Sequence, residues 1–230
     1  MLSTLLLPAR CPGCGRSGAS PCAVCARHLV AARPGAVPDG LTACWSLLSY
    51  EGVARLLVAD LKYRGDRSAL GWLADGMAAL TGPPPGAVVT WAPTTPGRRR
   101  RRGYDQAELL ARGVARRWRV PCRPLLAREE GPPQTGRSRA DRRVGPALRA
   151  RHRGPDAAHP VVVVDDVVTT GSTLAAAARA LVVAGRGPVS GLTAARAERP
   201  LLQPPVRSDA TTGCRDSSSS SVDDRPMWTS

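Results

Sequence analysis

The sequence contains no phenylalanine, and tryptophan and tyrosine together supply only 3% of its 230 residues. A core built on aromatic side chains is therefore excluded. Valine, leucine and alanine must fill it, and a hydrophobic content of 43% is sufficient for that. No run approaches the roughly 18 consecutive apolar residues of a membrane-spanning helix, so we expect no membrane insertion. Residues 5–7 are all leucine, but this run is too short for the core of a signal peptide and no basic residue precedes it. We therefore expect a cytoplasmic protein.

Lysine and histidine are also scarce. Lys62 is the only lysine, so arginine carries nearly all of the positive charge, and the three histidines are scattered along the chain, as is typical of surface positions. The formal net charge is +15, of which residues 97–153 contribute +13 from 18 arginines and five acidic residues. A uniform preference for arginine codons would not produce that concentration. A cluster of this charge would give salt-dependent affinity for nucleic acid.

Four of the seven cysteines form two Cys-x-x-Cys pairs near the N-terminus, Cys11 with Cys14 and Cys22 with Cys25. Each pair can turn its two thiolates toward one point, and two such pairs complete a tetrahedral zinc site. Disulfides are the alternative, but intracellular proteins seldom keep them. A redox Cys-x-x-Cys usually occurs singly, beside a βαβ unit. The spacing therefore predicts a compact structural zinc site with no open coordination position.

The most informative segment runs from Val161 to Thr173. Four consecutive valines predict a strand buried on both faces, and Asp165 and Asp166 stand where that strand is expected to end. A loop of hydroxyl residues and glycine follows and leads into an alanine-rich helix over 174–184. Ligands of parallel α/β sheets bind beyond the carboxyl ends of strands, and a glycine loop at a helix start offers N–H groups to phosphate. Carboxylates can accept hydrogen bonds from sugar hydroxyls, so the segment indicates a phosphorylated ribose. An ordinary strand and turn, or the acidic pocket of a receiver domain, are the alternatives.

The rest of the chain predicts alternating strands and helices. We expect strands over 43–50, 87–92, 120–126 and 189–195, and helices over 51–63, 68–80 and 106–118. Residues 128–153 are expected to form a long basic loop, with at most one helix. These patterns predict an α/β fold with a parallel-centred sheet and flanking helices. We divide the chain into a zinc segment and linker, a ligand-binding domain and a disordered tail, which span residues 1–40, 41–199 and 200–230.

The segment from Val161 to Thr173 resembles the motif with which type I phosphoribosyltransferases bind phosphoribosyl diphosphate (PRPP). That motif has apolar residues, two acids, two variable residues and a Thr-Thr-Gly-x-Thr type loop, and every part is present here without a gap. The resemblance implies that the catalytic pair Asp165 and Asp166 holds the ribose 2- and 3-hydroxyls. It also implies that Thr169 to Thr173 surround the 5-phosphate.

Further segments resemble one branch of that superfamily, the ComF family of predicted phosphoribosyltransferases. They are the paired cysteines, Leu61-Lys62-Tyr63-Arg64-Gly65-Asp66, the arginine-rich approach to Arg102-Gly103-Tyr104-Asp105-Gln106, and Pro133-Gln134 with the arginines after it. Together they run in family order over residues 11–199. The resemblance places diphosphate-contacting loops at about 93–106 and 128–146. The substrate-binding residues it implies are Val167, Val168, Thr169, Thr170, Gly171, Ser172, Thr173, Arg102 and Gln106.

The function expected from this resemblance is transfer of phosphoribosyl from magnesium-bound PRPP to an acceptor, with loss of pyrophosphate. Structural zinc and magnesium are the implied metals. No residue of the sequence stands out as a general base for an acceptor, so the acceptor stays open. The alternatives are a protein that binds PRPP or a nucleotide without turnover, and a protein that handles single-stranded DNA during uptake. For stacking on such DNA, residues 97–153 offer only Tyr104 and Trp118.

Overall fold

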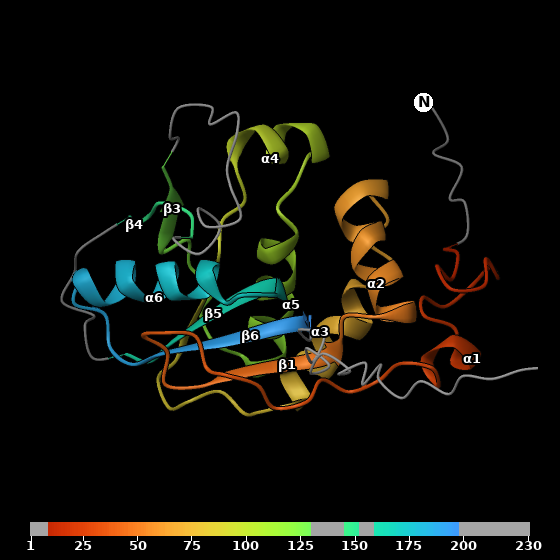
Figure 1. Cartoon of the computed structure of the whole chain (residues 1–230), viewed down its shortest axis with the longest axis horizontal. Helices are drawn as coiled ribbons and strands as arrows, with labels where there is room; N and C mark the ends of the chain where they lie inside the picture. Colours follow the sequence, from red (N-terminus) through yellow and green to blue (C-terminus); the bar gives the residue numbers. More distant parts are fainter. Residues whose placement is uncertain (1–8, 130–144, 152–158, 198–230) are drawn as a thin grey trace, which may run out of the picture. The chain divides into compact units, whose positions relative to one another are not determined.

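A four-stranded parallel sheet forms the centre of the computed structural model, which describes residues 9–129, 145–151 and 159–197 (Figure 1). Its strands are β1 (Cys44–Ser49), β2 (Val88–Trp91), β5 (Val161–Val168) and β6 (Val189–Arg196). Their order across the sheet is β1-β6-β5-β2, and every neighbouring pair is parallel. The predicted α/β class with a parallel-centred sheet is thereby confirmed.

Helices and one small second sheet surround these strands. The helices are α1 (Ala23–Ala26), α2 (Gly52–Ala59), η1 (Asp60–Arg64, a π-helix), α3 (Leu70–Ala79), α4 (Pro96–Arg102), α5 (Gln106–Trp118) and α6 (Ser172–Val183). The second sheet pairs β3 (Leu126–Arg128) with β4 (Leu148–Ala150), antiparallel. In the part of the chain that is described, no helix is both long and apolar enough to cross a membrane.

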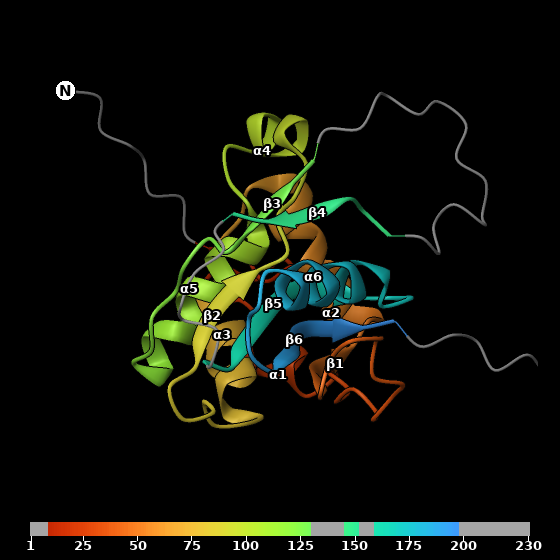
Figure 2. The ribbon, with the colours of Figure 1, turned by 90° about the vertical axis from the view of Figure 1, so that its left-hand side faces the viewer.

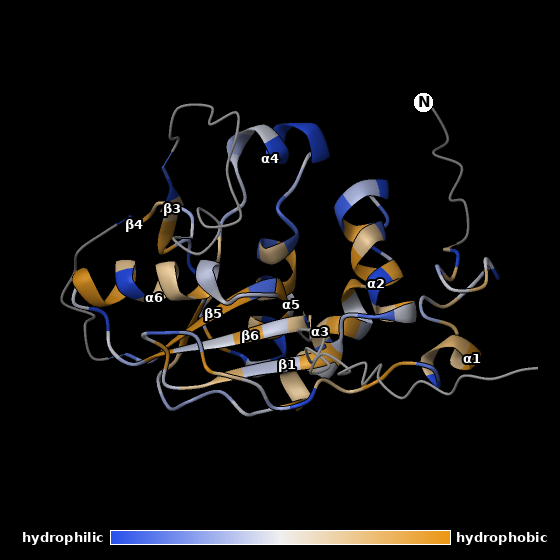
Figure 3. Cartoon of the chain, in the orientation of Figure 1, coloured by the Kyte–Doolittle hydropathy of each residue, from blue (hydrophilic) through white to orange (hydrophobic). Residues whose placement is uncertain are grey.

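The central strand β5 is buried on both faces because its valines alternate between two apolar clusters. Val162 and Val164 pack in the cluster that contains residues of α3 and α5, whereas Val161 and Val163 pack with α6 and with β3. Figure 2 lets the reader follow these layers, and Figure 3 shows that β5 is largely hydrophobic and α4 largely hydrophilic. A run of four valines without alternation is thus the pattern of a strand covered on each side.

Four local features differ from the expectations. The strand predicted to end at 164 continues through both aspartates to Val168, because Asp166 finds buried polar partners there. The strand predicted over 120–126 is wrong: Cys122 makes only an isolated bridge, to Val89, and β3 begins at Leu126. Its partner β4 lies in the segment expected to be a loop. The end of the helix predicted over 51–63 is a π-helix.

The arginine block forms the helix α4, a helix that is not among those predicted from the sequence. Thr95 caps its first turn by accepting a hydrogen bond from the backbone N–H of Arg98, and Pro96 occupies the first turn, where proline is tolerated. Arginine is itself a good helix former. The predicted tail over 200–230, and most of the predicted loop over 128–153, lie outside the described residues.

Candidate functional site

A cavity of about 440 Å³ opens where β1, β2 and β5 end. Tyr50 follows β1, Thr94 follows β2 and Thr169 follows β5, so parallel strands deliver all three to one edge of the sheet. Seven of the sequence-predicted site residues line this cavity. They are Asp165, Asp166, Val167, Thr169, Thr173, Arg102 and Gln106.

Asp166 is buried and both of its carboxylate oxygens have partners. The Lys62 Nζ lies 2.8 Å from Oδ1, and the Gln106 side chain donates a 2.7 Å hydrogen bond to Oδ2. Gln106 in turn accepts a 2.9 Å hydrogen bond from the Arg102 guanidinium. Four side chains from η1, β5, α5 and α4 thus form one connected polar chain along the cavity.

Asp165 alternates to the other side of β5 and has a different environment. Burial, followed by repulsion from the neighbouring Asp166, raises the pKa of Asp165 well above the ordinary value of 3.8. Its Oδ1 accepts a 2.8 Å hydrogen bond from the Asp166 backbone N–H. Asp165 lines both the main cavity and a small concavity beside it, so it stands between the two.

The loop after β5 bounds that small concavity, together with Asp165 and the first residues of α6. Gly171 adopts a left-handed conformation, with φ of 78°, and begins α6 without a side-chain cap. The Ser172 N–H and hydroxyl both contact the Thr170 hydroxyl oxygen, at 3.4 and 3.0 Å. Val168 packs in the core and also lines the small concavity, as do residues 169–173. Hydroxyls and backbone N–H groups at the start of a helix are suited to binding an anion.

The structure separates the five arginines of α4 by helical periodicity. Arg98, Arg101 and Arg102 line the cavity, while Arg99 forms a 3.2 Å ion pair with Glu108 on α5. Arg100 is exposed and is not among the lining residues. The sequence alone does not show which of these arginines face the cavity, because that depends on the helix α4, which lacks apolar periodicity.

Sequence reasoning missed several residues of the cavity wall, and Lys62 above all. Although burial favours the neutral amine, the Asp166 carboxylate and its hydrogen bond raise the pKa of Lys62. Tyr63 lines the cavity beside it, as do Tyr50, Thr94 and Arg128. The Lys62-Tyr63 segment is a signal in the sequence, but its resemblance to a family pattern does not indicate which residue Lys62 contacts.

The four N-terminal cysteines form a cluster whose sulfur atoms all lie within 4.8 Å of one another. A Cβ at Gly13 would lie 2.8 Å from the Cys25 sulfur, so only glycine fits there. Burial alone would raise the pKa of the Cys11 thiol, but backbone N–H donors, led by that of Cys22, lower it to about 6. Four converging thiols with N–H donors around them suit a tetrahedral metal such as zinc.

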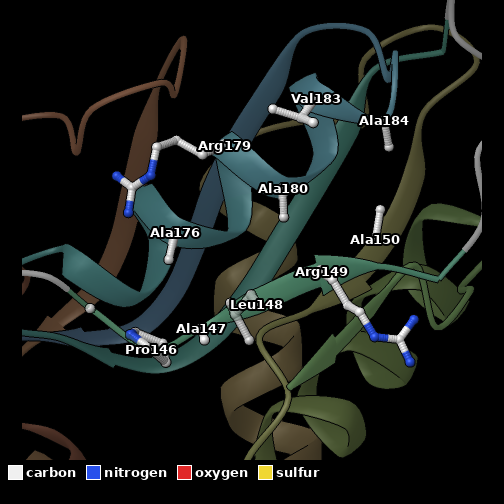
Figure 4. A pocket seen from close by; sticks show the side chains of 11 residues that line it. Pro146, Ala147, Leu148, Arg149, Ala150, Ala176, Arg179, Ala180, Val183 and Ala184 are labelled. Carbon is white, nitrogen blue, oxygen red and sulfur yellow. The ribbon is translucent and has the colours of Figure 1, made fainter. Parts of the chain in front are cut away.

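A second cavity, of about 590 Å³, lies between β4 and α6 (Figure 4). Alanine is its commonest lining residue, and Arg149 and Arg179 are the only charged side chains in the described wall, with guanidinium groups that point away from one another. Among the described residues, no carboxylate, thiol or histidine lines this cavity. The cavity of about 440 Å³, which is lined by Asp165 and Asp166, is therefore the better candidate for a functional site.

No protein-family model matches the chain, and no curated protein matches it in sequence. The chain combines a parallel α/β sheet with an N-terminal four-cysteine cluster and a polar cavity at the carboxyl edge of the sheet.

Proposed function

We propose that the cavity binds PRPP with magnesium and that the protein is a phosphoribosyltransferase of the ComF type. One observation carries the proposal. The acid pair, the hydroxyl–glycine loop and three arginines of α4 surround a single cavity or its immediate neighbour. A ligand that is at once a sugar, a monophosphate and a diphosphate uses all three groups.

Different groups of residues in the cavity wall suit different parts of PRPP. The loop over 169–173 receives the 5-phosphate on its N–H groups and hydroxyls. Asp165, which stands between the two concavities, accepts hydrogen bonds from the ribose hydroxyls, with Asp166 beside it. The guanidinium groups of Arg98, Arg101 and Arg102 receive the diphosphate, whose oxygens they can bind in pairs.

The chemistry is displacement at the anomeric carbon of the ribose. A nucleophile, a nitrogen lone pair in this superfamily, forms the new bond while the bond from that carbon to the diphosphate oxygen breaks, and the electron pair leaves with pyrophosphate. The protein holds the sugar in position and neutralises the departing charge with arginine. Magnesium would enter with the diphosphate and would supply further charge neutralisation, and the Asp165 carboxylate in the cavity wall would be a suitable oxygen ligand.

For the cysteine cluster we propose a structural zinc ion held by Cys11, Cys14, Cys22 and Cys25. All four positions of a tetrahedral ion would then be filled by thiolates, which leaves no position for substrate. The cluster packs against Val53 at the start of α2. The metal would therefore anchor the N-terminal segment and take no part in the transfer.

Calorimetric titration with PRPP and magnesium tests the binding step, with Asp166→Asn as the site variant. We expect saturable binding by the wild type and at least tenfold weaker binding by the variant, with unchanged far-UV circular dichroism. Wild-type protein that does not bind PRPP would overturn the proposal. Release of pyrophosphate, followed by ³¹P NMR with a panel of nitrogen acceptors, then tests transfer.

Binding of PRPP without any release of pyrophosphate would favour the alternative, a protein that senses PRPP. One structural observation supports this alternative. The described wall of the cavity contains no histidine, and its two carboxylates already belong to the acid pair. Single-stranded DNA is the other alternative, on the strength of the charge over 97–153. DNA binding with a steep salt dependence, together with no measurable binding of PRPP, would favour this DNA-binding alternative.

A further inference from the structure

Two consecutive residues of the segment Leu61-Lys62-Tyr63, Lys62 and Tyr63, line the candidate site, and Leu61 before them is buried in the core. It belongs to η1, the π-helix that ends the α2 segment. Short π-helical turns inside helical segments occur frequently at functional sites, because the extra residue in the turn changes the direction of the side chains. Here the turn brings Lys62 to β5, across the edge of the sheet.

The residues on either side of Lys62 hold this turn in place. The buried Tyr104 donates a 2.5 Å hydrogen bond from its hydroxyl to the Leu61 carbonyl. On the other side, the Arg102 guanidinium lies 5.4 Å from the centre of the Tyr63 ring, within cation–π range. Both contacts come from the corner between α4 and α5. The position of Lys62 is therefore fixed relative to the arginine helix.

Lys62 itself meets one carboxylate oxygen of Asp166, while Gln106 meets the other. The Lys62 side chain is 19% exposed and that of Asp166 is 7% exposed, so water screens this pair little. A carboxylate fixed at both oxygens has one orientation, and each oxygen retains a further acceptor site for a ligand.

We propose that Lys62 is a positioning residue of the site, which holds the Asp166 carboxylate in the orientation that the ribose requires. The inference rests on the proposed function, since it specifies how the acid pair is prepared for its ligand. Lys62 acts through Asp166 and takes no part in the bond changes at the anomeric carbon.

The test compares the affinity for PRPP and magnesium of three variants with that of the wild type. Lys62→Met keeps the length of the side chain and removes its charge, and Lys62→Arg restores the charge. Arg64→Met is the matched control, because Arg64 lies on the same turn, is 72% exposed and pairs with Asp60 away from the cavity. We expect binding about tenfold weaker or worse for Lys62→Met, substantial recovery for Lys62→Arg, and less than about a twofold change for Arg64→Met.

A second measurement covers the case in which Lys62→Met fails to fold. Because Lys62 is the only lysine, reductive ¹³C-methylation labels a single side-chain amine. We expect its NMR signal to move when PRPP and magnesium are added, and to differ between the ligand-free wild type and Asp166→Asn.

The outcomes separate the two proposals. Equal affinities of wild type and Lys62→Met, or a lysine signal unmoved by saturating PRPP and by Asp166→Asn, would overturn the role of Lys62 and leave the proposed function standing. Wild-type protein without affinity for PRPP would overturn the proposed function and this inference with it.

Discussion

The arginines of α4 provide the sharpest test of the cavity, because the helix presents two of them differently at adjacent positions. Both side chains are exposed, but Arg101 lines the cavity and Arg100 does not. Arg101→Met and Arg100→Met remove the same charge from the same helix. Their difference in affinity for PRPP therefore measures contact and not net charge.

The expected magnitudes follow from the geometry. A hydrogen bond to a charged group is worth about 1.5–3 kcal/mol, and each 1.4 kcal/mol or so changes a dissociation constant tenfold. Arg101→Met should therefore raise the dissociation constant for PRPP and magnesium by roughly 10- to 100-fold. A surface charge about 10 Å from the ligand acts through water and salt with well under 1 kcal/mol, so Arg100→Met should cost less than about twofold.

Calorimetry at two ionic strengths is the appropriate assay. The Debye length falls from about 10 Å in 0.1 M salt to about 3 Å in 1 M salt, so a contact effect should persist where a diffuse field effect disappears. Equal weakening by both variants, vanishing together at high salt, would refute the division of α4 into a cavity face and an outer face. It would indicate that the helix acts only as a region of positive potential.

Three further predictions concern stability and metal content. Purified protein should contain about one zinc per chain by elemental analysis, and Cys14→Ser should lower that content. A chelator should lower the melting temperature of the wild type, and metal-free protein of full stability would contradict the zinc assignment. Asp165→Asn should raise the melting temperature at pH 7 by a few degrees, because the folded state raises the pKa of this carboxyl. An acid with a raised pKa destabilises the fold above the unfolded value of 3.8, so the gain should shrink as the pH falls toward it, and a gain independent of pH would contradict this. Asp105→Ala should lower the free energy of unfolding by about 1–2 kcal/mol in urea titrations, because Asp105 accepts the backbone N–H groups of Thr94 and Ala107, at 2.8 and 3.0 Å; an unchanged midpoint would count against that capping role.

The sheet and the acid pair could be predicted because their signals are local. Residues 161–173 contain a strand, two acids and a loop in one continuous segment, and strands of valine need no distant partner to be recognised. The class of the fold followed from the alternation of such strands with amphipathic segments. The four cysteines likewise carry their geometry in their spacing.

The remaining parts of the site depend on contacts between distant segments. Nothing in the local sequence indicates that Lys62 meets Asp166, since the lysine lies on a helix that reads as an ordinary amphipathic one. The block from Arg98 to Arg102 has no apolar periodicity, so its helix rests on the Thr95 cap, on intrinsic propensity and on the ion pair with Glu108. The pairing of β3 with β4 joins two very short strands, and three residues are too few for a strand pattern.

The separation along the chain of the cavity residues has a consequence for folding. Tyr104 meets the Leu61 carbonyl across 43 positions, and Gln106 meets Asp166 across a further 60. Contacts of this range carry a large loop-closure entropy and form only when the sheet is nearly complete. A partly folded chain would therefore lack the pocket altogether, and a ligand bound there would stabilise the entire domain by mass action. The heat-induced unfolding temperature, followed against ligand concentration, would thus report on cooperativity between the N-terminal and C-terminal halves of the domain.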